Sequence, residues 1–184
     1  MYFFLLPLII GFVSNIASAF TTTYSEKWGK QTGTFITILL RDIFGIPVWA
    51  IGFVLALKES SGMLYHSSFL SQLTGWLIIT FGAIIVIIAL ISIKGKAAAP
   101  STGDSLVKSG IYSLVRHPIH SGTFLEFTGL FILCPSPEVG IAAMLGIIWI
   151  FFQSRFEEKD LIRRIPEYKK YIEDIPRFFP DILK

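Results

Sequence analysis

Polar side chains that could do chemistry crowd into one short stretch, residues 110–122, which reads Gly-Ile-Tyr-Ser-Leu-Val-Arg-His-Pro-Ile-His-Ser-Gly. Gly110 permits the left-handed backbone that ends a short helix. Pro118 lacks an N–H and suits the first position of a new helix, which would run into the apolar residues 119–133. The sequence therefore predicts a bend at the mouth of a hydrophobic helix. The bend carries Tyr112, Arg116, His117 and His120.

A bend of this kind offers unpaired N–H groups and cationic side chains, which together suit a bound carboxylate. A simpler interpretation is that Arg116 and His117 only anchor a membrane helix at the level of the lipid head groups. Residue types alone leave both interpretations open.

A second polar group follows the last apolar run, where residues 153–161 read Gln-Ser-Arg-Phe-Glu-Glu-Lys-Asp-Leu. These side chains could form a solvated amphipathic helix rich in local ion pairs. For Glu157 and Glu158 we favour a functional role beside the bend. Pro166 should break this helix. Tyr168, Tyr171 and the run 176–180 could then fold back as an aromatic lid or as an interfacial belt.

The composition is that of a membrane protein. Of the 184 residues 53% are hydrophobic, against about 45–50% in soluble domains, and the excess lies in long runs. We predict an all-α integral membrane bundle of about five transmembrane helices with a cytoplasmic helical tail. The predicted spans are 2–20, 34–57, 69–93, 119–134 and 140–152, the last two of them short and joined by a proline turn. Cys134, the one cysteine, excludes an internal disulfide and a cysteine metal cluster.

The charge distribution predicts the orientation. Of the 16 lysines and arginines, all but Arg41 and Lys58 lie in the first connection, the third connection or the tail. By the positive-inside rule the N-terminus faces outside, and the bend and the tail share the cytoplasmic face. The same topology explains the net charge of +3 better than nucleic-acid binding does, and we expect no nucleic-acid partner.

We expect one membrane domain, 1–184, with three spans in 1–93 and the functional half in 94–184. Residues 21–33 and 94–109 read as polar connections, the second with a short helix from Asp104 or Ser105 to Lys108. Ala17-Ser18-Ala19 resembles a signal-peptidase site, but no basic segment precedes the apolar run, so we expect it to stay uncleaved. Arg41 and Asp42 interrupt the second span, either as intramembrane functional charges or as residues at the membrane interface.

Taken together, the motifs resemble the isoprenylcysteine carboxyl methyltransferase family, including its prokaryotic relatives and the phospholipid methyltransferases. The matching pattern is Gly-Ile-Tyr-x-x-x-Arg-His-Pro-x-x-x-Gly, then Glu-Glu-x-x-Leu-x-x-x-Ile-Pro-x-Tyr-x-x-Tyr, then Pro-Arg-x-x-Pro, within about residues 103–180. The resemblance implies a cytoplasmic-side pocket for S-adenosylmethionine and a lipophilic acceptor that enters from the bilayer.

The resemblance also assigns residues. The cofactor pocket would contain Tyr112, Arg116, His117, Pro118, Glu157, Tyr168 and Tyr171. Catalytic roles would fall to Arg155, Glu158 and His120, and no metal is expected. The chain departs from the family at three places: His120 replaces a usual Tyr, Ile165-Pro166 stands near an absent Phe-Gly, and Gln153 occupies the place of an Arg. These departures concern the acceptor more than the cofactor.

The acceptor decides the chemistry. A carboxylate is already a nucleophile and needs only orientation, for which Arg155 is suited, whereas an amine needs a base such as His120 or Glu126. We expect a carboxyl methyltransferase first and a phospholipid or amine N-methyltransferase as the alternative. An NADPH-dependent membrane reductase and a non-enzymatic scaffold remain further alternatives. Three histidines are too few for a membrane di-iron oxidase. The sequence leaves the oligomeric state open.

Overall fold

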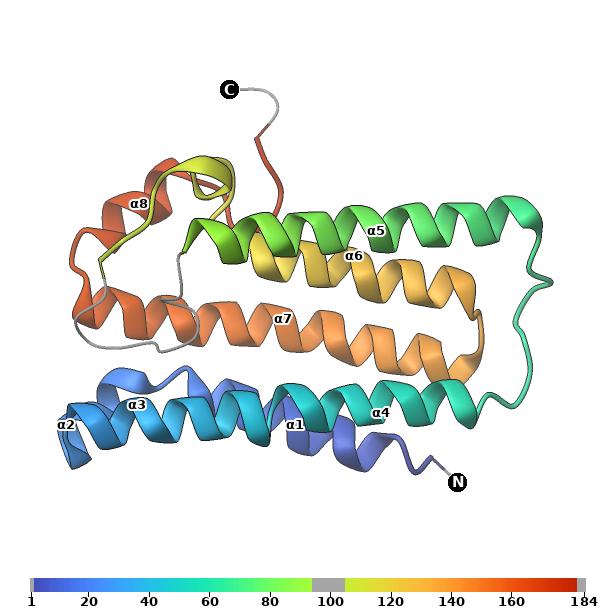
Figure 1. Ribbon diagram of the computed structural model, residues 1–184, viewed down its shortest axis with the longest axis horizontal. Helices are drawn as coiled ribbons and strands as arrows, with labels where there is room; N and C mark the ends of the chain where they lie inside the picture. The colour runs from blue at the N-terminus through green and yellow to red at the C-terminus, as the bar shows by residue number, and fades with distance from the viewer. Residues whose placement is uncertain (1, 94–104, 182–184) are drawn as a thin grey trace.

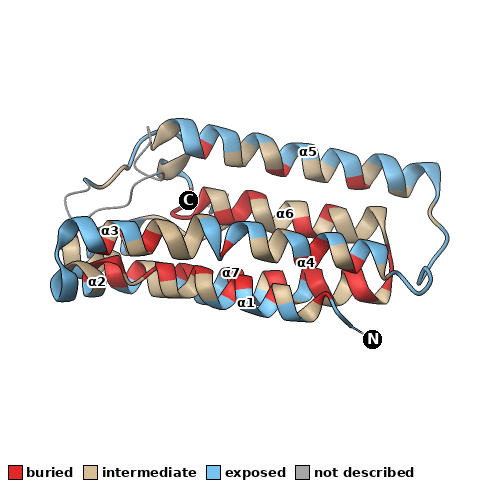
Figure 2. Cartoon of the chain, turned by 60° about the horizontal axis from the view of Figure 1, so that its bottom comes forward, coloured by how far each residue is buried: buried red, intermediate tan, exposed pale blue. Residues whose placement is uncertain are grey.

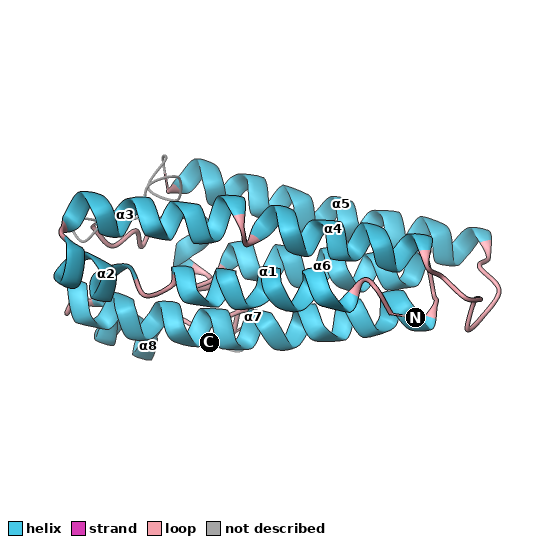
Figure 3. Ribbon diagram, turned by 90° about the horizontal axis from the view of Figure 1, so that it is seen from below, coloured by secondary structure: helices cyan, strands magenta, loops and turns pink. Residues whose placement is uncertain are grey.

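The computed structural model describes residues 2–93 and 105–181, and every regular element in these residues is a helix (Figures 1 and 3). The α-helices are α1 (Leu5–Ser18), α2 (Thr21–Trp28), α3 (Lys30–Ile38), α4 (Ile46–Lys58), α5 (Phe69–Ser92), α6 (Pro118–Leu133), α7 (Pro137–Arg164) and α8 (Tyr168–Asp174). A π-helical turn (Leu39–Ile43) joins α3 to α4, and a 3-10 turn (Gly110–Ser113) precedes α6. The predicted all-α membrane bundle is confirmed.

Three helical stretches are long and apolar enough to cross a membrane, namely Lys30–Lys58, Phe69–Ser92 and Pro137–Arg164. The bent pair α1 and α2, with an angle of 64° between the two helices, makes a fourth if it counts as one span. With 16 residues, α6 is shorter than the roughly 20 residues of a full span. The outer face of α5 exposes large apolar side chains such as Phe69, Trp76 and Phe81 (Figure 2). In water such a surface would be unfavourable, whereas lipid tails solvate it.

Helices α5 and α6 approach each other until their backbones touch. A Cβ added at Gly82 would lie 2.6 Å from the carbonyl oxygen of Gly122, and one at Gly122 would lie 2.5 Å from that of Gly82. Gly75 and Gly129 form a second contact of this kind, two turns further along α6. Gly122 and Gly129 lie seven residues apart and therefore share one face of α6. Small residues permit such close contact, which drives helix association in lipid.

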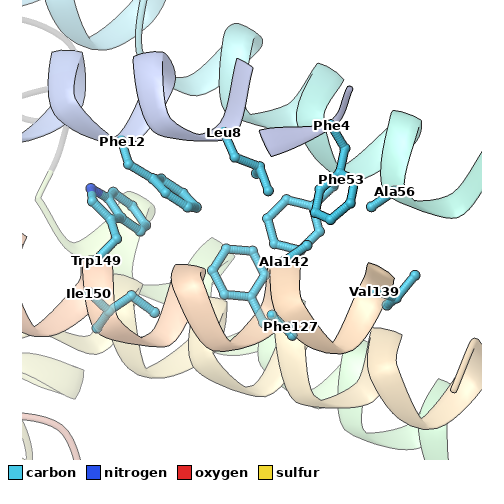
Figure 4. Close-up of a cluster of buried hydrophobic side chains, with 11 residues drawn as sticks. Phe4, Leu8, Phe12, Phe53, Ala56, Phe127, Val139, Ala142, Trp149 and Ile150 are labelled. Carbon is cyan, nitrogen blue, oxygen red and sulfur yellow. The ribbon is translucent and has the colours of Figure 1, made fainter. Parts of the chain in front are cut away.

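The hydrophobic core joins the N-terminal helices to α6 and α7 (Figure 4). Phe12 stacks on Trp149 with ring centroids 5.0 Å apart, and Phe53 stacks on Phe127 at 4.6 Å. Aromatic pairs in these geometries add about 0.5–1.5 kcal/mol each beyond the area they bury. The core therefore fixes α1 and α4 against the half of the chain that carries the motifs.

The N-terminal half differs from its prediction at residues 21–28, and it adds a contact within the second predicted span. Residues 21–28 form α2 rather than a polar loop, because the buried Asp160 carboxylate accepts the backbone N–H of Thr22 at 2.9 Å and holds this segment against α7. Adjacent residues on an ideal helix point about 100° apart. Nevertheless Arg41 and Asp42 form a bidentate pair, with 2.8 and 2.9 Å between nitrogen and oxygen, within the wider π-helical turn.

The C-terminal half also corrects the sequence interpretation. The apolar run 140–152 and the polar start of the tail belong to one continuous helix, α7, which ends before Pro166 as predicted. Gly110 does adopt φ +62°, but it begins a 3-10 turn instead of ending a helix, and residues 105–108 are not helical. The proposed cap Asp104 lies outside the described residues.

Replacing Gly122 with alanine should destabilise the folded protein by about 1–3 kcal/mol, because the added methyl overpacks a backbone contact that has no flexible side chain to give way. Thermal unfolding in a mild detergent measures this effect. Gly62→Ala is the matched control, since no atom lies within 4 Å of its added Cβ. An unchanged unfolding midpoint for Gly122→Ala would contradict the close α5–α6 contact.

Candidate active site

The C-terminal tail folds back onto the bend before α6. The backbone N–H of Arg116 donates to the carbonyl of Pro176 at 2.9 Å, and that of His117 donates to the carbonyl of Arg177 at 3.0 Å. The Ser121 hydroxyl donates to the carbonyl of Phe178 at 2.6 Å. The tail therefore occupies the two N–H groups that directly precede Pro118, and these are not available to a bound carboxylate.

The buried carboxylate of Glu158 holds this arrangement together. Its Oε1 accepts from Nε and Nη2 of Arg116 at 3.1 and 3.0 Å, and from Nε of Arg177 at 3.1 Å. Its Oε2 accepts from Nη2 of Arg177 at 2.6 Å. The remaining Arg116 nitrogen, Nη1, donates to the carbonyls of Ile172 and Ile175 at the end of α8. Arg116 is thus committed to the protein itself and not to a ligand.

Glu157, the neighbouring acid, lies against two histidines. Its Oε2 lies 3.5 Å from Nδ1 of His117 and 4.0 Å from Nδ1 of His120. Its Oε1 accepts from Nε2 of Gln153 at 2.8 Å. The other nitrogen of His117, Nε2, lies 3.2 Å from Oε1 of Glu158. Ligand atoms of His117, His120 and Glu157 all lie within 4.8 Å of one another, so the three side chains could also hold a metal ion.

Burial and neighbouring charges shift the pKa values of the ionisable side chains that lie outside the membrane-spanning helices. Burial alone lowers the pKa of His117, but its hydrogen bonds to Glu157 and Glu158 and their negative charges raise the pKa above 6.5 overall. A protonated imidazole can donate to both carboxylates. Burial raises the pKa of Tyr112 and of Tyr168, and it raises the pKa of Tyr171 to about 12. These tyrosines therefore stay neutral, and the Tyr171 hydroxyl donates to the carbonyl of Tyr112.

A cavity of about 640 Å³ opens beside this network. One wall comes from the 3-10 turn, α6, α7 and α8, and the opposite wall from α1, the π-helical turn and α4. The last turn of α5 contributes Leu90, and Ile93 follows it. Ligand pockets usually have volumes of about 300–1,000 Å³ with a few polar groups in an apolar lining. The cavity has the size and the lining of a binding site for a small organic molecule.

Most of the predicted site residues meet at this cavity. Those on its wall are Tyr112, Arg116, His117, Pro118, His120, Glu157, Tyr168 and Tyr171. Two of the expected catalytic residues are not on the described wall. Arg155 is exposed, because two residues along a helix turn a side chain about 200° away from Glu157. Glu158 lies behind His117 and Arg116, where it positions them. Glu126, the candidate base on α6, packs beside Gly82 and also lies off the wall.

The structure adds residues that the sequence did not single out. Arg177 is the second cation on Glu158, and its place in the Pro-Arg-x-x-Pro motif was the available signal. Asn15, Trp49 and Trp149 line the cavity, and Trp149 packs edge-on against His120 with ring centroids 5.9 Å apart. These three residues lie within apolar runs of the sequence, so no local motif marked them as site residues. Gln153, where the family usually has Arg, points inward and is almost fully buried.

Replacing Glu158 with glutamine should destabilise the protein by about 3–5 kcal/mol, because two arginines lose their shared buried counter-ion. The tail should then detach from the bend. Thermal unfolding and limited proteolysis after residue 164 measure the two effects.

Glu167→Gln is the matched control, since Glu167 is exposed on the short connection between α7 and α8. If the tail of the Glu158→Gln variant resisted protease as well as that of the unmodified protein, the Glu158 network would not hold it.

The fold and the cavity define a helical membrane protein with a buried ionic site at one end of its bundle. The phospholipid methyltransferase family model matches residues 70–169. The chain therefore belongs to the phospholipid methyltransferase family. The matched segment contains the bend, α6, α7 and the start of α8, which together hold most of the site.

The chain is also similar to curated proteins. The chain is 34% identical over 85 residues to human protein-S-isoprenylcysteine O-methyltransferase, which covers 45% of this chain and 30% of the human protein. It is 30% identical over 140 residues to the cobalt-zinc-cadmium resistance protein CzcN of Cupriavidus metallidurans, which covers 73% of this chain and 63% of CzcN. The chain thus spans less than two thirds of these relatives. No solved structure matches significantly. The predicted resemblance to isoprenylcysteine methyltransferases is confirmed.

Proposed function

We propose that the protein is an S-adenosylmethionine-dependent methyltransferase that acts on a lipophilic acceptor, most favourably on its carboxyl group. One observation carries this proposal: the family-matched residues His117, His120 and Glu157 converge on a cavity beside the hydrophobic core. The names of the human and mouse relatives support the carboxyl acceptor. The description of the family model supports a lipid acceptor and keeps N-methylation as the alternative.

The residues on the wall fit such a cofactor. The Glu157 carboxylate suits an ammonium or ribose hydroxyls, and the aromatic faces of Tyr112, Tyr168 and Trp149 suit an adenine ring or a sulfonium. S-adenosylmethionine, when bound, supplies an electrophilic methyl group. Arg116 was expected to hold the cofactor carboxylate, but its guanidinium is already bonded to Glu158 and two carbonyls. We therefore assign Arg116 the role of shaping the pocket.

The chain's own residues contribute positioning and exclusion of water, which is what in-line displacement chiefly requires. Tyr168 and Tyr171 of α8 line the cavity together with His117. If the acceptor were an amine, a base would have to take its proton, and His120 is the candidate that the cavity contains. A carboxylate needs no base. Of the arginines, Arg41, Arg116 and Arg164 line the cavity, whereas the expected orienting residue Arg155 does not.

The same proposal includes the domain organisation of the protein, its orientation in the membrane and its partners. We propose that residues 1–184 act as one membrane domain with the N-terminus outside and the site at the cytoplasmic face. The acceptor would then reach the cavity from the surrounding lipid. The partners would be a lipophilic or lipidated molecule and membrane lipids.

The first test is incubation of the protein in lipid nanodiscs with methyl-labelled S-adenosylmethionine and a lipid extract, followed by mild base. We expect label in the lipid fraction that base releases as methanol, which identifies an ester. Base-stable label would indicate N-methylation. If the folded protein neither bound the cofactor nor transferred label, a membrane reductase or a non-enzymatic scaffold would replace the proposal.

Glu157→Gln should weaken cofactor binding by roughly tenfold or more, because a hydrogen bond to a charged group contributes about 1.5–3 kcal/mol. Isothermal titration in nanodiscs measures this change. Glu173→Gln, an exposed position on α8, is the control. Equal affinities for the two variants would remove Glu157 from the cofactor site.

A second candidate function is binding of a divalent metal by His117, His120 and Glu157. Two relatives, CzcN and the nickel-cobalt-cadmium resistance protein NccN of Alcaligenes xylosoxydans xylosoxydans, are named for metal resistance. We rank it second because a metal must displace the proton that Glu157 and Glu158 stabilise on His117. Zinc retained on equilibrium dialysis and lost in His120→Gln would reverse this ranking.

A further inference from the structure

Gln153 is buried next to the site without lining the cavity. On α7, Trp149, Gln153 and Glu157 follow one another at intervals of four residues, so they share one face of the helix. Trp149 and Glu157 line the cavity, whereas Gln153 lies between them and is not among the described residues of its wall. The residue is 2% exposed. Gln153 can therefore affect a bound ligand only through a neighbouring residue.

That neighbour is Glu157. Nε2 of Gln153 donates to Oε1 of Glu157 at 2.8 Å. The other carboxylate oxygen, Oε2, faces Nδ1 of His117 at 3.5 Å and Nδ1 of His120 at 4.0 Å. A hydrogen bond to an ionised acceptor is stronger than one between neutral groups. One oxygen of Glu157 is thus fixed to its own helix while the other faces the two histidines.

The second polar atom of Gln153 indicates which contact orients its amide. Oε1 of Gln153 is buried and has no hydrogen-bond partner in the part of the chain that the structure describes. Rotating the amide by half a turn would place this oxygen against the Glu157 carboxylate, and both groups can only accept. The amide therefore keeps its donor on Glu157, although a buried acceptor without a partner is unfavourable. The contact with Glu157 is what orients Gln153.

The direction in which Glu157 points matters because this residue lines two cavities. Besides the main cavity it borders a second one of about 160 Å³. The second cavity is polar, since its wall includes the hydroxyl residues Ser18, Thr21 and Thr37 and the arginines Arg41 and Arg164. A carboxylate is more stable in polar surroundings than in apolar ones. Without a restraint, the Glu157 carboxylate would favour the second cavity over the main one.

We propose that Gln153 is a positioning residue that holds the Glu157 carboxylate at the main cavity, facing His117 and His120. This inference rests on the proposed methyltransferase function, in which Glu157 binds the cofactor, and names the residue that fixes this carboxylate in place. Loss of the Gln153 amide would leave the charge of Glu157 in the protein but would release it from its position.

The first experiment measures binding of S-adenosylmethionine to the full chain in nanodiscs by isothermal titration. Gln153→Met keeps a side chain of similar length and removes the amide, and we expect it to weaken binding roughly fivefold to tenfold. The thermal unfolding midpoint should not fall, because methionine also removes the unpaired buried acceptor. Gln31→Met is the matched control, since Gln31 is exposed on α3.

Combining Gln153→Met with Glu157→Gln distinguishes positioning from an independent role. The double variant should bind the cofactor no more weakly than Glu157→Gln alone, because a residue that acts through Glu157 has no further effect once that carboxylate is gone. Additive losses would overturn the inference. Unchanged affinity in Gln153→Met would also overturn it, and so would a loss of affinity accompanied by a lower unfolding midpoint.

Exchanging the two side chains keeps the contact and moves the charge. Gln153→Glu together with Glu157→Gln retains a hydrogen bond between an amide and a carboxylate, but it shifts the carboxylate by one turn of α7. We expect this variant to fold and to bind the cofactor as weakly as Glu157→Gln. Affinity equal to that of the unmodified protein would mean that the place of the carboxylate is unimportant, which would overturn the inference.

Nitrogen-15 NMR of the histidine rings tests the positioning without any cofactor. The chain has three histidines, and His66 lies exposed in the connection between α4 and α5. Gln153→Met should shift the ring signals of His117 and His120 and leave that of His66 in place. If the unmodified protein did not bind S-adenosylmethionine, the proposed function would fail, while these shifts would still support the positioning role. Unchanged signals from His117 and His120 would overturn it.

Discussion

The structure depends on one buried carboxylate. Glu158 lies on α7, and its two oxygens accept from Arg116 in the bend and from Arg177 in the tail. A single unpaired charge in this position would be strongly unfavourable, so the three segments are stable only together. The backbone bonds from Arg116 and His117 to the tail follow from the same contact. Segments some 40 and 20 residues away from Glu158 in sequence are thereby fixed beside the cavity.

The charged residues of the site fall into two sets, according to whether they bond to one another or line the cavity. Arg116, Glu158 and Arg177 bond mainly to one another and shape the site, whereas His117, His120 and Glu157 form the ionic wall of the cavity. On the opposite wall the N-terminal helices bring Asn15, Trp49 and the Arg41–Asp42 pair. A cavity with side chains from both halves of the chain can orient two reactants against each other, which is the main requirement for a displacement reaction.

The lipid environment accounts for the close α5–α6 packing and for the apolar outer surface. The glycine contacts between α5 and α6 depend on close packing, because helices in a bilayer gain no hydrophobic free energy from associating. The outer face of α5 is exposed (Figure 2), and its exposed side chains include large apolar ones. The aromatic core between α1, α4, α6 and α7 (Figure 4) joins the family-matched half to the half that lies outside the match.

The sequence by itself determined the helical membrane class, the bend at Pro118, the helix end before Pro166 and the residues of the ionic wall, because apolar period, proline geometry and local motifs are short-range signals. Only the tertiary structure decided what each charge does. Arg116 and Glu158 are partners across 42 residues, Arg155 faces outward, and α7 continues through the polar boundary that the sequence indicated. Asn15, Trp49 and Trp149 read as ordinary members of apolar helices. Their shared cavity arises from packing between distant helices, which no local pattern encodes.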